Sequence, residues 1–139
     1  MPNSQAQASA AITEAERPPS GFVRLELVAT VAAVWAVDDL DRLPAIEHEH
    51  GLAWDAVRSR FHYRQRPGLH VIAVELSRLR VPAELPEIRR YAGCVSWVAL
   101  ESAVEVAHAE RVVAPADFAA RLRRLCDALG APTEQTPPP

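Results

Sequence analysis

Lysine is absent from this chain of 139 residues, and its 15 basic residues other than histidine are all arginine. The formal net charge is −3, so the chain as a whole has no general attraction for phosphate backbones. Nucleic-acid binding would therefore need a local basic patch. A nuclease site of the restriction type uses two carboxylates and a lysine, and the absence of lysine argues against that site here.

Cysteine and long apolar runs are also scarce. The two cysteines, Cys94 and Cys126, occur in a chain whose first residues do not resemble a signal peptide, which predicts reduced thiols. The longest apolar run is far too short to span a bilayer. These features predict a cytoplasmic protein with no membrane segment.

The composition, with 49% hydrophobic and 24% charged residues, is sufficient for one core. We expect a single globular domain over residues 21–130. Residues 1–20 are rich in Ala, Ser and Gln, and residues 131–139 end in three prolines. Neither stretch can bury enough apolar surface to offset its ordering entropy, so we expect a disordered leader and a disordered tail.

Periodicity predicts the elements of the first half. Apolar residues occupy the odd positions from Val23 to Val37, which predicts a long strand with one face on the core. A short helical turn over 40–46, capped by Asp38 or Asp39, precedes a helix over 53–63. The nearly continuous apolar run 69–76 predicts a central strand covered on both faces.

The second half yields one clear helix. Prolines bracket an extended connector over 82–86, and residues 95–100 are expected to form another strand. The stretch 101–113 is either strand or loop. From Pro115 to Gly130 the apolar spacing predicts a helix, with Cys126 buried and inert at the border of its stripe. The predicted class is α+β: three or four strands in a small sheet, packed by a central helix and a C-terminal helix.

The stretch PEIRRYAGCVSWVAL, residues 86–100, predicts a specific local geometry. Gly93 permits a positive φ, and Tyr91 and Trp97 are large rings that favour buried bodies with paired polar tips. We expect a sharp corner that leads into a buried segment. Cys94 beside it is either a small buried hydrophobe, which we favour because no His is adjacent, or an activated thiol.

The run YAGCVSW, preceded by SRLRVPAELPEI, resembles the signature of an uncharacterised bacterial family, the domain of unknown function DUF1802. The upstream segment LPAIEHEHGLAWDAVRSRFHYRQRPGLHVIAVELSRL is also similar to the family pattern. The resemblance covers about residues 23–100 and implies that the chain is the later part of the family domain. At Glu75 the family tends to carry Arg. The motif positions that the resemblance marks as candidate binding residues are His50, Arg60, Tyr91, Gly93, Cys94, Ser96 and Trp97.

The run Glu47-His48-Glu49-His50 is the cluster that could hold a metal. Alternating His side chains share a side in an extended segment but diverge by about 200° on a helix. A third ligand would have to come from His62, His70 or His108. We favour a solvated polar turn, with His50 capping the next helix and His70 as a core-edge histidine bonded to backbone. Neither a metal nor another cofactor is therefore predicted.

Four arginines at positions 58, 60, 64 and 66 could form a small basic edge. The alternative is a solvated helix face that pairs with nearby acids. We favour the second interpretation because the overall charge is acidic.

Three functional classes remain open. A noncatalytic interaction or ligand-binding module is preferred, because no set of residues satisfies a catalytic template. An accessory protein of a DNA-processing or restriction-type system is supported by the company that the resembled family is said to keep and by the four arginines. A thiol-dependent or metal-dependent enzyme would use Cys94 with His50 or His70.

The expected partner is a protein. If the first family segment is missing, the strand over 23–37 loses a neighbour, and an unpaired edge of that length invites pairing with another chain. This predicts either a homodimer or docking on a separate protein.

Overall fold

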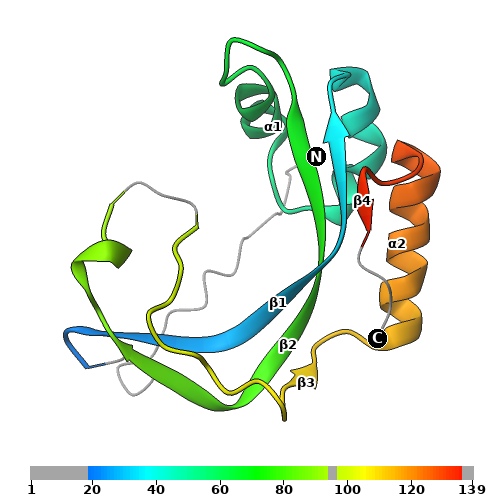
Figure 1. Cartoon of the computed structure of the whole chain (residues 1–139). Helices are drawn as coiled ribbons and strands as arrows, with labels where there is room; N and C mark the ends of the chain where they lie inside the picture. Colours follow the sequence, from blue (N-terminus) through cyan, green and yellow to red (C-terminus); the bar gives the residue numbers. More distant parts are fainter. Residues whose placement is uncertain (1–18, 94–96, 136–139) are drawn as a thin grey trace, which may run out of the picture. The chain divides into compact units, whose positions relative to one another are not determined.

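The computed structural model describes residues 19–93 and 97–135, which form an α+β fold as predicted (Figure 1). Its sheet has the strand order β3-β2-β1-β4 with antiparallel neighbours. The elements in chain order are β1 (Phe22–Val37), η2 (Leu40–Glu49), α1 (Trp54–Phe61), β2 (Leu69–Pro86), η3 (Arg89–Tyr91), β3 (Glu110–Arg111), α2 (Pro115–Leu129) and β4 (Glu134–Gln135). The expected leader up to residue 18, the last four tail residues, Cys94 and Ser96 lie outside the described residues.

The chain divides into two compact units, and β1 and β2 each run from one into the other. The described part of the first unit consists of residues 19–26, 81–93 and 97–105. The second unit consists of residues 27–80 and, as far as the chain is described, 106–135. Each unit is described below by itself.

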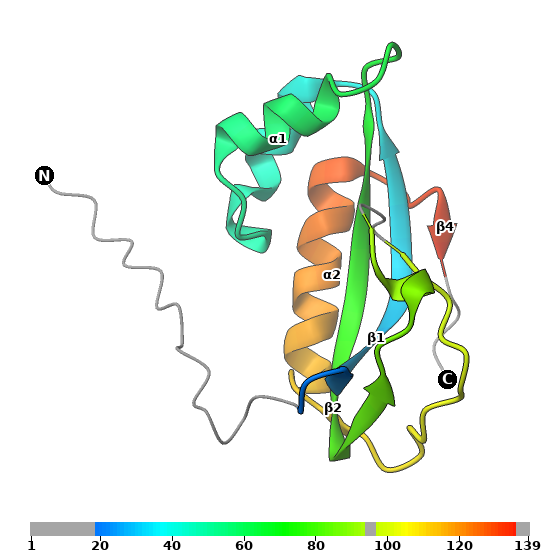
Figure 2. The ribbon, with the colours of Figure 1, turned by 90° about the vertical axis from the view of Figure 1, so that its left-hand side faces the viewer.

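The second unit contains the hydrophobic core. There α1, η2 and α2 lie on one side of β1 and β2 (Figure 2), and α2 and α1 both contact η2. The buried core residues come from all five of these elements: Ala33, Trp35, Val37, Leu43, Ile46, Val57, Phe61, Ala73, Leu125 and Leu129. On β1 the buried positions have odd numbers, as the alternation predicts.

Local sequence explains the three helices of this unit. The Asp39 carboxylate accepts a hydrogen bond from Asp41 N at 3.0 Å, and Pro44, which has no N–H, lies inside a 3-10 helix. In α1 the apolar stripe buries Val57 and Phe61. Pro115 begins α2 at a position where its missing N–H costs nothing, and Gly130 ends it. These three predictions are confirmed.

Trp35 connects the core of β1 to the end of α2. Its side chain is 2% exposed, and its indole Nε1 donates a hydrogen bond to Gly130 O at 2.9 Å. Just beyond, Thr133 N donates to Val34 O at 2.7 Å, and β4 follows within the stretch expected to be a tail. The return of the chain after α2 is therefore fixed against β1.

Gly68 marks the close approach of the β2 start to the end of β1. Its φ is +149°, and a Cβ at this position would lie 3.2 Å from Val37 O. A side chain would therefore be strained here by both conformation and contact. This glycine fixes where the chain can re-enter the sheet after α1.

The first unit has a different character, because none of its described residues is buried. It contains the start of β1, the end of β2, η3 and the chain from 97 to 105. Glu87 N donates to Gly21 O at 2.8 Å, and Arg24 pairs with Glu26 at 2.8 Å and lies 3.8 Å from Glu84. Polar contacts, rather than a core, hold this ribbon.

Several predictions about strands are wrong. The prediction that both faces of this strand are covered is wrong, because His70 and Ile72, which share one face of β2, are exposed. Leu69, Val71 and Ala73 on the other face do pack in the core. His70 is thus no core-edge histidine. The connector over 82–86 is simply the end of β2. In the expected strand over 95–100, the described residues 97–100 belong to no helix or strand. Nor is β1 an outer strand, because it lies between β2 and β4, although β4 pairs only with Ala33 and Val34 among the described residues.

Candidate functional site

Several large apolar side chains of the first unit are exposed, and we refer to these residues together as the apolar surface. Trp97 is 80% exposed and Val81 is 77% exposed. Three further large hydrophobic residues of this unit are exposed to a smaller degree: Phe22, Val98 and Leu100. Trp97 contradicts the expectation that the corner leads into a buried segment. The described residues of this unit therefore combine exposed apolar side chains with the absence of any buried residue.

The corner itself is partly as predicted. Gly93 has a φ of +120°, and the half-buried Tyr91 accepts a hydrogen bond from Glu101 N to its Oη at 3.0 Å. The phenol therefore fixes the returning chain to η3. Because Cys94 and Ser96 lie outside the described residues, their roles stay predictions.

The histidines of the EHEH run point to a local structural role. His50 ends η2 in an extended conformation, and its Nδ1 accepts a hydrogen bond from Leu52 N at 3.2 Å. His50 thus organises the turn before α1, but the prediction that it caps this helix is wrong, because the N-cap of α1 is Ala53 and no side chain bonds to it. His48 is exposed and lies 3.4 Å from its neighbour Glu47. Among residues 19–93 and 97–135, no three His, Cys, Asp or Glu side chains gather as metal ligands would.

Glu49 is a structural residue that the sequence reasoning missed. Its side chain is 14% exposed, and its two carboxylate oxygens accept hydrogen bonds from Arg121 Nε at 2.9 Å and Arg124 Nε at 2.8 Å. The hydrogen bond from Arg121, followed by that from Arg124, lowers the pKa of Glu49 below its usual value of 4.5. Two arginines three residues apart on α2 were the available signal, but no local pattern identifies their partner.

Another ion pair joins β2 to β3. Arg111 donates to Glu75 at 3.0 Å, and Arg111 is the register partner of Ser77. Val112 N adds a backbone hydrogen bond to Leu76 O at 2.9 Å. Glu75, where the family resemblance implies Arg, is therefore paired with a cation in this chain.

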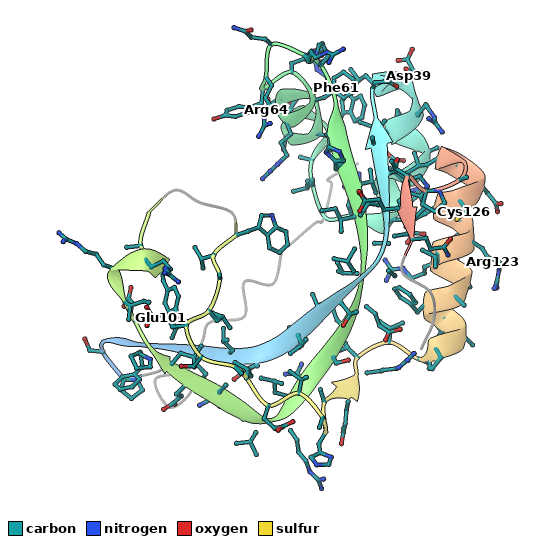
Figure 3. The ribbon with its side chains drawn as sticks, viewed as in Figure 1. Asp39, Phe61, Arg64, Glu101, Arg123 and Cys126 are labelled. Atoms are coloured by element: carbon teal, nitrogen blue, oxygen red, sulfur yellow. The ribbon has the colours of Figure 1, made fainter. Side chains whose placement is uncertain are left out.

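The four arginines of α1 and the turn after it form the third feature, here called the arginine segment. Arg58 and Arg60 lie in the last turn of α1, and Arg64 and Arg66 lie beyond its end. All four are exposed, and none makes an ion pair or side-chain hydrogen bond with another described residue. The four side chains are thus solvated, as the favoured interpretation expects, but the pairing with nearby acids is not found among the described residues. In Figure 3, Phe61 lies between α1 and the strands, whereas Arg64 lies on the outer side.

The predicted binding residues are thus distributed over both units. His50 and Arg60 belong to the second unit, whereas Tyr91, Gly93 and Trp97 belong to the first. Within the first unit they contribute to the corner and the apolar surface. Their role in binding remains a prediction.

Comparison with known proteins gives one match. The model of a family described as Domain of unknown function (DUF1802) matches residues 2–124. The chain belongs to this family. No curated protein and no solved structure matches it.

The extent of the DUF1802 match corrects two expectations. It begins at residue 2 and ends at residue 124, so it extends on both sides of the predicted 23–100. The suggestion that only the later part of the family domain is present is not supported, and the argument for an edge left by a missing segment loses its basis. No helix in the described part of this DUF1802 chain is long and apolar enough to cross a membrane.

Proposed function

We propose that this DUF1802 protein is a noncatalytic interaction module that binds a protein partner through the apolar surface of its first unit. The observation that supports this most directly is the contrast between the units. Every buried residue of the described chain belongs to the second unit, whereas the first unit has exposed Trp97 and Val81. An apolar surface in a unit whose described residues include none that is buried gains most from a partner that removes it from water.

The chemistry of the surface favours protein as the partner. Trp is the residue most enriched among those that dominate binding energy at protein interfaces, and aliphatic side chains such as Val81 and Leu100 exclude water around it. The ion pair of Arg24 with Glu26 neutralises charge on the same unit. The partner is either a second copy of this chain or a different protein. The experiment below distinguishes these two possibilities.

The test combines self-association with partner capture. A photocrosslinking amino acid at position 97 of the full chain, expressed in its own cells, is expected to form a discrete crosslinked product. Mass spectrometry identifies that product as a dimer or as a complex with another protein. A Trp97→Ala and Val81→Ser variant should weaken the same complex by about tenfold or more, as expected for truncation of a central Trp.

The matched control is Leu52→Ser, which removes an exposed apolar side chain from the second unit. We expect it to leave the complex unchanged. If position 97 gives no product above that formed from position 52, and the protein sediments as a monomer at high concentration, the proposal is wrong.

A further inference from the structure

The arginine segment concentrates positive charge in an acidic chain. Residues 54–66 hold four arginines and a single acid, Asp55, although the whole chain has a net charge of −3. In the same unit Arg111, Arg121 and Arg124 each pair with a carboxylate, but the four arginines of the segment pair with none in residues 19–93 and 97–135. Like charges so close together repel one another, and an anionic ligand would relieve that repulsion.

Helix electrostatics accounts for only half of the segment. Cations in the last turn of a helix interact favourably with its dipole, which explains Arg58 and Arg60. Arg64 and Arg66 lie past the helix end, where this effect has fallen off. An open depression on α1 is lined by Asp55, Arg58, Ser59 and His62. The last two arginines therefore need another explanation.

Tyr63 lies among these cations and indicates the kind of anion. It is 85% exposed, while two residues earlier Phe61 is buried in the core and fixes the end of α1. Tyr63 N donates to Arg60 O at 3.3 Å, so the backbone that carries the phenol is held by the helix end. An exposed ring between arginines matches the requirements of unpaired bases, which stack on aromatic faces while cations contact the phosphates.

We propose that the arginine segment, with Tyr63, binds single-stranded nucleic acid. Arg64 and Arg66 contact successive phosphates, and Tyr63 stacks on a base between them. An acidic peptide would satisfy the arginines but would not use the ring. A duplex would satisfy the arginines but would keep its bases stacked on one another. This surface lies wholly in the second unit, so it is independent of the apolar surface.

The test is fluorescence anisotropy of the full chain with labelled oligothymidylate and oligouridylate of about 20 nucleotides, titrated over a range of salt concentrations. We expect saturable binding that weakens as salt rises. The double variant Arg64→Ala, Arg66→Ala should lower the slope of log affinity against log salt by about 1.4, at about 0.7 for each lost phosphate contact. Its matched control is Arg80→Ala, Arg123→Ala, which removes two other exposed arginines of the same unit and should leave the slope unchanged.

The ring is tested separately from the charge. Tyr63→Ala should weaken binding by about tenfold at every salt concentration, and Tyr63→Phe should retain it, because stacking needs the ring and not the hydroxyl. A preference for either oligonucleotide identifies the sugar that is bound. No binding, equal loss in the Arg80/Arg123 control, no effect of Tyr63→Ala, or equal affinity for poly-glutamate or for duplex DNA would each overturn the proposal.

Discussion

At the scale of single residues, Glu49 shows how one side chain can join two elements that no local pattern connects. It lies at the end of η2, and its carboxylate bonds two arginines of α2. The carboxylate is largely buried, whereas the two guanidinium groups are about half-exposed. Water therefore screens the attraction between the charges mainly at the arginine side. The resulting contact holds α2 against η2.

Glu49→Gln should lower the free energy of unfolding by about 1 kcal/mol at neutral pH, because it removes the charge that both arginines share. The pKa of Glu49 is lowered in the folded protein, so its contribution is present above the usual value of 4.5 and is lost as the pH falls through the lower folded-state pKa. Urea unfolding at pH 7 and at strongly acid pH measures the difference. The control Glu47→Gln alters an exposed carboxylate and should change little at either pH.

Equal stability losses for Glu49→Gln at both pH values would mean that packing, and not charge, is responsible. Double-mutant cycles with Arg121→Ala and Arg124→Ala then separate the two contributions. We expect coupling of Glu49 to each arginine.

Trp35 is the other residue on which the second unit depends. Trp35→Phe removes part of a fully buried ring and leaves Gly130 O without its indole donor. We expect a loss of about 2–3 kcal/mol in the free energy of unfolding. Trp54→Phe, at a Trp that is exposed on α1, should cost less than about 1 kcal/mol. Similar midpoints of urea unfolding for the two variants would contradict this prediction.

At the scale of elements, β2 is one strand with two environments. From Leu69 to Arg80 it belongs to the second unit and contributes Ala73 and Leu79 to the buried residues. From Val81 to Pro86 it belongs to the first unit, where no described residue is buried. A single strand, Leu69–Pro86, is therefore buried in part over its first twelve residues and has no buried residue over its last six.

Amide hydrogen exchange should show this change along β2. We expect slow exchange over 69–80 and much faster exchange over 81–86, because local opening is easier where few apolar contacts oppose it. Mass spectrometry of overlapping peptides measures the difference. Uniform protection along the strand in the isolated protein would contradict the prediction, whereas new protection over 81–86 on adding a captured partner is what the proposed function requires.

The elements that sequence predicts well are those whose burial is set by their own periodicity. Alternation identified β1, and the spacing of Val57 with Phe61 and of Leu125 with Leu129 identified α1 and α2. The corner was half predictable: the positive φ of Gly93 follows from its residue type, but the exposure of Trp97 does not. A Trp is apolar in any sequence, and only the absence of neighbours in space shows that it is uncovered.

The candidate sites show the same limit. His48 and His50 were considered as metal ligands because residue types that bind metals are adjacent in the sequence. In the structure, however, the Nδ1 of His50 accepts a hydrogen bond from the backbone N–H of Leu52. The pairing state of Arg64 and Arg66 depends on which acids lie nearby in space, which the overall charge of the chain does not determine. The overall composition therefore predicted that acids neutralise these arginines, but no ion pair with them is found among the described residues.

At the scale of the whole molecule, the second unit is built from two separate stretches of chain, and the segment Val81–Glu105 of the first unit lies between them in the sequence. Leu125 and Leu129 of α2 pack with core residues that all come from before position 81. A break in the first unit would therefore leave the second unit held together by its core and by the Glu49 contact.

A specific protease site inserted at the exposed residues Glu101 and Ser102 tests this organisation. After cleavage, we expect both fragments to elute as one particle, with the tryptophan emission spectrum of the uncut protein, because burial of Leu125 and Leu129 stabilises the association by about 3–6 kcal/mol. Leu129→Ala should have little effect on the elution of the uncut protein but should release the C-terminal fragment after cleavage, since it removes a large share of that burial. Dissociation of the cleaved protein without Leu129→Ala would show that chain connectivity through the first unit, and not the core, holds α2 in place.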